Sequence, residues 1–161
     1  YERASYKAAV KYRRCIIIAD GFFEHHHYQN QKYPFYVQPA NHHLLLIAGI
    51  WDRWEYPASG NVLYTVSVVT TKATGIMERV HNNPKLKEAR MPLLLDDDRK
   101  AIWMRAQAQP KPDWLNQVLA PVQPPALRVY PVAKIRGKKA TGNIPEVRRE
   151  TSYPELPVFW T

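Results

Sequence analysis

The chain has 161 residues, of which 45% are hydrophobic and 12% aromatic, and this composition is typical of a globular domain and argues against a disordered tail. Its single cysteine, Cys15, excludes an internal disulfide and favours a reducing compartment, so we expect a cytoplasmic protein. No apolar stretch reaches the ~18 residues of a membrane span, and we expect no membrane partner. Lys and Arg number 23 against 14 Asp and Glu, and the net charge of +9 has the sign of a polyanion-binding surface.

The first half of the chain predicts a short helix followed by strands. Residues 5–12 place apolar side chains at helical spacing. The β-branched run that ends at Asp20-Gly21 is typical of a buried strand closed by a turn. The polar residues 29–32 separate two strand-like segments and predict a hairpin. We expect strands over 15–19, 22–28, 33–38, 44–50 and 62–71.

In the second half, helices and strands alternate with polar and proline-rich segments. We expect a helix over 72–81, a polar and mobile insertion over 82–89, and a short extended piece over 90–95. The acidic residues 96–98 favour the start of a helix to about 107, because the N-terminal helix dipole attracts negative charge. Six prolines between 110 and 131 break the remaining chain into short pieces. These are a helix over 112–119, a strand over 127–132 and a basic loop over 134–139.

Several short strands with helices between and after them predict an α+β fold, namely a mixed, barrel-like β-sheet with short flanking helices. We expect a single domain over 1–161 and a monomer. The tail at 147–161 either packs on this domain or binds a partner. Because the sequence starts at Tyr1 rather than Met, we interpret its start as a fragment edge or a processed end.

Two polar residues are candidates for acid–base chemistry. Glu24 follows a strand and a turn and lies between aromatic neighbours, where a carboxylate can serve as a general acid or base. The alternative is a glutamate that points outward from a strand whose phenylalanines point inward. His81 follows a predicted helix and precedes a turn, where a titratable ring can project into a cleft. A helix C-terminus by itself also favours a protonated histidine.

Other polar residues admit a binding or a structural interpretation. On a strand, His25 and His27 would share a face and could begin a metal site, but no zinc spacing is present, so we interpret them as a surface cluster and expect no metal. Arg14 and its neighbour Arg13, together with Arg90 and the loop 134–139, are candidates for phosphate contacts.

Six blocks in chain order carry a resemblance to a known family. They are RRCIIIADGFFE at 13–24, LIAGIW at 46–51, VVTT at 68–71, MERVHN at 77–82, RMP at 90–92 and YPV at 130–132. Together these blocks resemble the SRAP (SOS-response-associated peptidase) family, whose members process abasic sites in DNA. The resemblance covers nearly the whole chain to about residue 146.

The resemblance implies a basic cleft that binds single-stranded DNA with abasic sites, without a cofactor, and a nucleoid-associated location when DNA is bound. In the family, an N-terminal cysteine condenses with the aldehyde of the ring-opened abasic sugar and forms a thiazolidine crosslink. Glu24 matches the family glutamate, which assists ring opening and handles protons on the imine. His81 matches the family histidine, a proton donor near the deoxyribose oxygen. Thr70 and Arg90 match positions that hold the DNA backbone.

The chain also departs from the family pattern. The nucleophilic cysteine and an Asn-Ala-Arg segment would lie upstream of Tyr1. Cys15 cannot replace that cysteine, because an internal cysteine lacks the free α-amine that a thiazolidine requires, and we expect it to pack in the core. This chain as written should therefore not form the crosslink. His25 stands where the family often has Trp, and residues 83–89 lengthen the connection to Arg90.

Three other functions stay open at the level of sequence. A basic β-rich module could bind RNA or DNA through Trp51, Trp54 and Tyr56 without chemistry. The family's older description implies a peptidase that cleaves its own leader. A zinc-dependent hydrolase is the most distant alternative.

Overall fold

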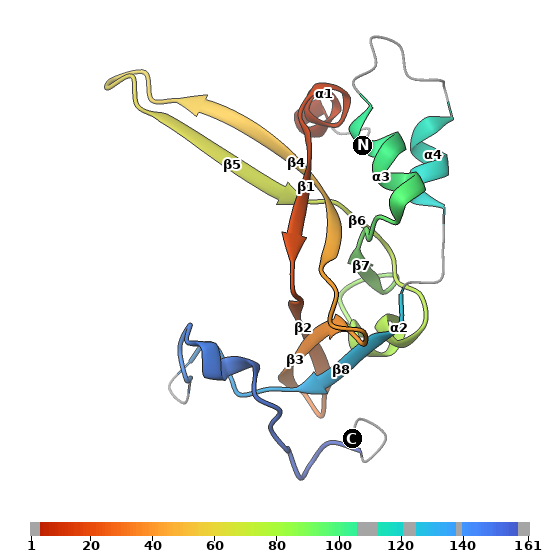
Figure 1. Cartoon of the computed structure of the whole chain (residues 1–161). Helices are drawn as coiled ribbons and strands as arrows, with labels where there is room; N and C mark the ends of the chain where they lie inside the picture. Colours follow the sequence, from red (N-terminus) through yellow and green to blue (C-terminus); the bar gives the residue numbers. More distant parts are fainter. Residues whose placement is uncertain (1–3, 106–112, 121–124, 138–139, 158–161) are drawn as a thin grey trace. The chain divides into compact units, whose positions relative to one another are not determined.

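The computed structural model describes residues 4–105, 113–120, 125–137 and 140–157. In this part of the chain, short helices accompany three β-sheets, so the predicted α+β class is confirmed (Figure 1). The strands are β1 (Arg14–Ala19), β2 (Phe22–Tyr28), β3 (Gln31–Pro39), β4 (Leu45–Glu55), β5 (Val62–Val68), β6 (Thr70–Lys72), β7 (Arg90–Pro92) and β8 (Leu127–Pro131). The helices are α1 (Ala4–Tyr12), α2 (Ile76–Val80), α3 (Asp97–Met104), α4 (Trp114–Leu119) and the 3₁₀ helix η1 (Pro145–Arg148).

The sheets are separate and are not closed into a barrel. Their strand orders are β1-β4-β5, β2-β3-β8 and β6-β7, and the strand pairs of the first two sheets are antiparallel. A barrel has no edges, because every strand in it pairs on both sides. In the described part of the chain, β1, β5, β2 and β8 each pair on one side, so the barrel-like arrangement is not a closed barrel.

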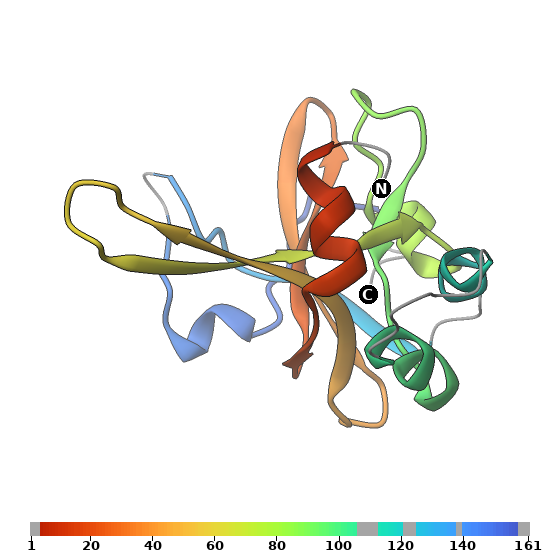
Figure 2. The same ribbon diagram turned by 90° about the horizontal axis from the view of Figure 1, so that it is seen from above.

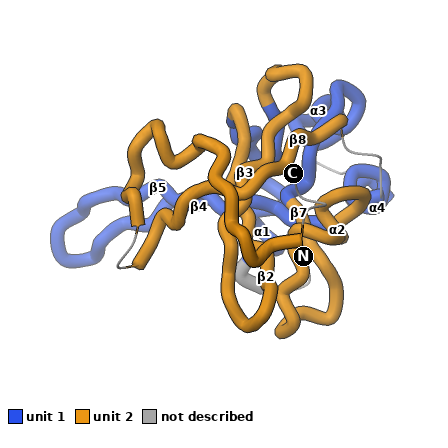
Figure 3. Tube along the Cα trace, turned by 90° about the horizontal axis from the view of Figure 1, so that it is seen from below, with its two compact units in different colours: residues 1–19, 45–71, 92–121 blue, residues 20–44, 72–91, 122–161 orange. Residues whose placement is uncertain are grey.

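The chain passes back and forth between two compact units (Figure 3). Unit 1 consists of residues 1–19, 45–71 and 92–121, and unit 2 of residues 20–44, 72–91 and 122–161. The chain changes unit within β6 and again within β7. Each unit has its own three-stranded sheet and its own buried residues.

Unit 1 contains the sheet β1-β4-β5 with helices α1, α3 and α4. Helix α1 lies against β1 and β4 (Figure 2). Helix α3 begins at an N-cap, Asp96, whose side chain accepts a hydrogen bond from the backbone N–H of Arg99 at 2.8 Å. The core of the unit is a cluster of buried apolar residues: Ala9, Ala48, Ile50, Leu93, Leu95, Trp103, Leu115 and Val118.

Unit 2 contains the sheet β2-β3-β8 with helix α2 and the C-terminal segment. Gln29 and Asn30 connect β2 to β3, and both have positive φ angles, 46° and 59°, as tight hairpin turns require. The predicted hairpin is confirmed, with a shorter turn than 29–32. The C-terminal segment packs on its own unit, because the Tyr153 hydroxyl donates to the Val132 carbonyl at 2.8 Å and Tyr33 donates to Glu155 at 3.1 Å.

The largest error of the sequence prediction is the helix over 72–81. Lys72 belongs to β6, and the Ala73 N–H donates to the Ala89 carbonyl at 2.9 Å, so the chain stays extended there. Gly75 has a φ of 58°, outside the helical region, and α2 begins only after it. Long-range pairing has therefore replaced the first part of the expected helix.

Other boundaries differ by smaller amounts. The strand expected over 62–71 is divided into β5 and β6, and β4 runs to Glu55 rather than to Ile50. Helix α3 ends at Met104, and the predicted end near 107 lies outside the described residues. The same is true of residue 112 at the start of the α4 prediction and of residues 138–139 in the basic loop.

Candidate active site

Strand β2 determines on which face of the sheet the Glu24 side chain lies. Side chains alternate along a strand, so Glu24 shares one face with Phe22 and His26, whereas Phe23 and His25 lie on the other. Phe23 and His25 are exposed, while Glu24 is half-buried and His26 is buried. Glu24 therefore does not project outward between inward phenylalanines. Its Oε1 accepts a hydrogen bond from the His25 backbone N–H at 2.8 Å.

His26 joins this face of β2 to the C-terminal end of α2. Its Nδ1 lies 3.0 Å from the Arg79 carbonyl oxygen and 3.4 Å from that of Val80. Because carbonyl oxygens only accept, Nδ1 must carry a proton. Burial lowers the pKa of His26, although the same carbonyls partly oppose this effect. The face of β2 that carries Glu24 is thus bonded, through His26, to the last residues of α2, just before His81.

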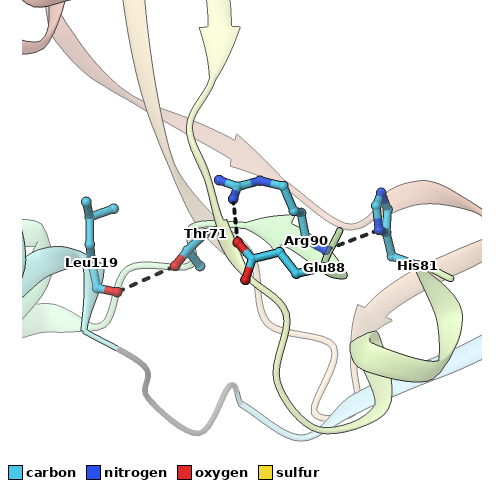
Figure 4. A network of polar contacts seen from close by, with 5 residues as sticks. All are labelled: Thr71, His81, Glu88, Arg90 and Leu119. Carbon is cyan, nitrogen blue, oxygen red and sulfur yellow. Dashed lines mark hydrogen bonds and ion pairs between the residues drawn. The ribbon is translucent and has the colours of Figure 1, made fainter. Parts of the chain in front are cut away.

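His81 follows α2 immediately and is half-buried. Its Nδ1 accepts a hydrogen bond from the Arg90 backbone N–H at 3.1 Å (Figure 4). A backbone N–H only donates, so Nδ1 must present its lone pair and the proton of the neutral ring lies on Nε2. The arrangement leaves His81 with an N–H donor on the side away from Arg90.

Asn82 fastens the segment after α2 to the edge of β2. Its Oδ1 accepts from the His27 backbone N–H at 2.7 Å, and its Nδ2 donates to the His27 carbonyl at 2.8 Å. His81 therefore lies between two contacts with β2, that of His26 before it and that of Asn82 after it. The sequence analysis did not name His26 or Asn82 as site residues. His26 could have been found, because residues two apart on a strand share a face and His26 is two residues after Glu24.

The predicted backbone-contact residues belong to different units. Arg90 is in unit 2, at the start of β7, and its guanidinium lies 3.4 Å from the carboxylate of exposed Glu88 (Figure 4). Thr70 is an exposed residue at the start of β6 in unit 1. Its neighbour Thr71 donates through Oγ1 to the Leu119 carbonyl at 3.5 Å in the same unit. The structure thus brings Glu24, His81 and Arg90 into one unit.

Arg14 has a structural position in unit 1. Its guanidinium donates to the carbonyls of Val10 and Lys11 at the end of α1, at 2.8 and 2.9 Å. It also donates to Trp103 and Arg105 at the end of α3, both at 2.6 Å. These carbonyls lack partners within their helices, and the cation satisfies them. Arg14 thus joins two helix ends, and the DNA contact that the sequence analysis expected of it stays a prediction.

Cys15 packs within unit 1. It lies on β1 opposite Gly49 of β4, and a Cβ atom at Gly49 would meet the Cys15 Sγ at 2.8 Å. Burial raises the pKa of the thiol, which favours the protonated and less reactive form. These contacts agree with the packing role expected from the sequence.

Neither a metal site nor a membrane segment is found in the described part of the chain. His25 and His27 share a face of β2, but no group of three or more His, Cys, Asp or Glu residues among the described ones is placed to hold a metal ion. None of the described helices has the length and apolarity needed to cross a membrane. A shallow pocket lies beside the C-terminal segment and includes Pro131, Tyr153 and Leu156, but not Glu24 or His81.

The lowered pKa of His26 predicts that the protein loses stability in mild acid. Below the ordinary histidine value of 6.5, the unfolded chain binds a proton that folded His26 resists, so the free energy of unfolding falls as pH decreases. This contribution is complete above pH 6.5. Urea unfolding at pH 7.5 and 5.5 should show the decrease, and H26Q should show a smaller one. His27, whose pKa is also lowered by burial, retains part of the effect. Equal pH dependence of the two proteins would contradict the assignment.

Comparison with known proteins identifies the family of the chain. The model of the SOS response associated peptidase (SRAP) family matches residues 1–138. Abasic site processing protein YoqW of Bacillus subtilis is 30% identical over 135 residues, which are 83% of this chain and 56% of that protein. Abasic site processing protein HMCES of Xenopus tropicalis is 30% identical over 164 residues, covering 90% of this chain and 46% of that protein.

Two crystal structures share the fold. A protein from Bacteroides thetaiotaomicron has a TM-score of 0.76 at 24% identity, covering 94% of this chain and 62% of that one. A protein from Bordetella bronchiseptica has a TM-score of 0.66 at 26% identity, covering 81% and 60%. Because the family model matches residues 1–138, most of its length, the chain belongs to the SRAP family. It spans about half the length of the curated relatives described above.

Proposed function

We propose that this chain is the DNA-processing part of an abasic site processing protein that binds single-stranded DNA. The observation that carries the proposal is the joint placement of Glu24 and His81 in unit 2, where His26 and Asn82 tie β2 to the end of α2. The names of the relatives and the basic net charge support the same function.

The proposed chemistry requires an N-terminal cysteine in a longer parent chain. Its α-amine adds to the C1′ aldehyde of the ring-opened abasic sugar, and loss of water gives an imine. The cysteine sulfur then adds to the imine carbon, and the nitrogen takes up the thiol proton as the thiazolidine ring closes. Each step moves a proton, so acid–base groups beside the sugar accelerate the sequence.

Glu24 and His81 would supply these proton transfers. Glu24 offers a half-buried carboxylate whose Oε1 is already held by the His25 N–H. His81 offers an Nε2–H donor, since its Nδ1 is engaged by Arg90. We assign Glu24 to ring opening and to the imine protons, and His81 to proton donation near the deoxyribose oxygen. Arg90 and Thr70 would hold the DNA backbone.

The test is covalent capture of single-stranded DNA that contains one abasic site. The parent chain with its N-terminal cysteine should give an adduct that survives denaturing electrophoresis, and the otherwise identical cysteine-to-serine protein should give none. Intact single-stranded DNA is the matched substrate control. An adduct that persists after the N-terminal cysteine is replaced would contradict the mechanism.

A second candidate function is supported by the β4–β5 hairpin of unit 1. Trp54 and Tyr56 are 49% and 43% exposed and lie in contact, with ring centroids 3.9 Å apart. Exposed aromatic rings can stack on nucleic acid bases without sequence preference. A module of this kind would bind single strands with salt-dependent affinity and without preference for an abasic site. Fluorescence anisotropy with paired intact and abasic oligonucleotides separates the two functions.

The family description also includes a peptidase activity, which we assign to removal of the parent chain's own leader. Mass spectrometry of the mature N-terminus tests this assignment. A single cleavage that exposes cysteine supports it, whereas general cleavage of added peptides would indicate a broader protease.

A further inference from the structure

We propose that Asn82 is a positioning residue that holds His81 in the orientation needed for proton donation. The inference rests on the proposed function of His81 and adds a residue to that site. In this role Asn82 would not contact the substrate, because both polar atoms of its amide are hydrogen-bonded to the backbone of His27.

The contact between Asn82 and β2 resembles the pairing of one more strand. In an antiparallel pair, every second residue directs both its N–H and its C=O away from the partner strand. The side-chain amide of Asn82 meets these two groups of His27 at 2.7 and 2.8 Å. Among the described strands, β2 pairs only with β3, so this edge is otherwise available. The side chain thus fixes the segment that follows His81 to a regular element.

The contact restricts His81 because further bonds hold the same short segment. The His81 backbone N–H donates to the Met77 carbonyl at 3.0 Å, and the Asn82 N–H donates to the Val80 carbonyl at 3.1 Å. On the ring, Nδ1 receives the Arg90 N–H at 3.1 Å. That last bond selects the Nε2–H form, and it forms only while the backbone of His81 stays in place. Loss of the Asn82–His27 hydrogen bonds should therefore give the His81 ring more freedom, so that both of its neutral tautomers are populated.

The chemistry of the contact requires an amide. Asn offers one acceptor and two donor hydrogens, which match the N–H and C=O of His27. In Asn82→Asp the carboxylate still accepts from the His27 N–H but has no hydrogen for the carbonyl, and it repels that oxygen. This variant keeps the size of the side chain, but it removes the donor and adds one negative charge. N82A removes the same pairing without adding charge, so the two variants are read together. The neighbouring Asn83 is the matched control, because its Oδ1 accepts from the Lys85 N–H at 3.1 Å rather than from the backbone of β2.

The first readout is the imidazole ¹⁵N spectrum of the chain, recorded at pH 9, where histidine rings are neutral. The His81 signals are assigned from their loss in H81Q. Wild type and N83A should show an unprotonated Nδ1 and a protonated Nε2. N82A and N82D should shift toward the mixture seen for free histidine. An unchanged His81 spectrum in both Asn82 variants would overturn the proposal.

The second readout is the adduct rate of the parent chain on abasic single-stranded DNA. We expect N82A and N82D to react about tenfold or more slowly, because small displacements of a catalytic group are costly. N82A, which adds no charge, should keep the wild-type DNA affinity, and N83A should keep the wild-type rate. Wild-type adduct rates in both Asn82 variants would overturn the positioning role. If wild type itself forms no adduct, the proposed function fails, and the ¹⁵N spectra still decide whether Asn82 orients His81.

Discussion

Replacing Glu24 with glutamine in the parent chain is expected to slow adduct formation on abasic DNA by about 10²–10⁴-fold, the usual contribution of a general acid–base group. Glutamine has nearly the same shape, and its Oε1 can still accept from the His25 N–H that lies 2.8 Å from the carboxylate. It cannot take up and return a proton at pH 7. The loss should therefore appear in the rate of the chemical step, measured in single turnovers at saturating DNA.

The matched control for this variant is E78Q. Glu78 is an exposed residue of α2 in the same unit, so its replacement changes the net charge equally and leaves the proposed site intact. We expect E78Q to react at the wild-type rate. Equal rates for E24Q and E78Q would remove Glu24 from the mechanism, whatever the behaviour of His81.

Replacing Trp103 with alanine should lower the free energy of unfolding by about 3–5 kcal/mol, as measured by urea denaturation. Trp103 is fully buried at the centre of the unit 1 core. Its indole N–H donates to the Cys15 carbonyl at 2.9 Å, so the variant loses both packing and one hydrogen bond. Typical domains are stable by only 5–15 kcal/mol, so such a loss removes a large share of the free energy of unfolding.

W54A provides the comparison for W103A. Trp54 is 49% exposed on the β4–β5 hairpin of the same unit, and its replacement should change the free energy of unfolding by less than about 1 kcal/mol. A similar loss in both variants would mean that aromatic content, rather than burial in this core, determines the stability of unit 1.

The sequence predicted the elements whose signals are local. The strand near 15–19 follows from a β-branched run, and the hairpin of β2 and β3 follows from two strand-like segments around a polar turn. The helix over 72–81 was wrong for most of its first half, because pairing of Ala73 with Ala89 and the positive φ of Gly75 outweigh local helical preference. Sequence periodicity does not report such pairing.

In the candidate site too, residues with local sequence signals could be predicted and residues with distant partners could not. Glu24 and His81 could be proposed from the sequence because their residue types and surrounding motifs are visible there. Asn82 and His26 were not, since their bonds join residues 55 and 53 positions apart. The partners of Arg14 were hidden for the same reason, because the Trp103 and Arg105 carbonyls that accept from it lie 89 and 91 positions away.

The amino-acid sequence alone determined the α+β class, the strand-forming runs and the residues that mark the family. Only the tertiary structure decided which polar side chains are committed to backbone groups, as Arg14 and Asn82 are, and which face of β2 presents Glu24. The physical reason is that a hydrogen bond depends on atoms within about 3 Å, whatever their separation along the chain. Folding brings those atoms together, and local residue patterns do not record it.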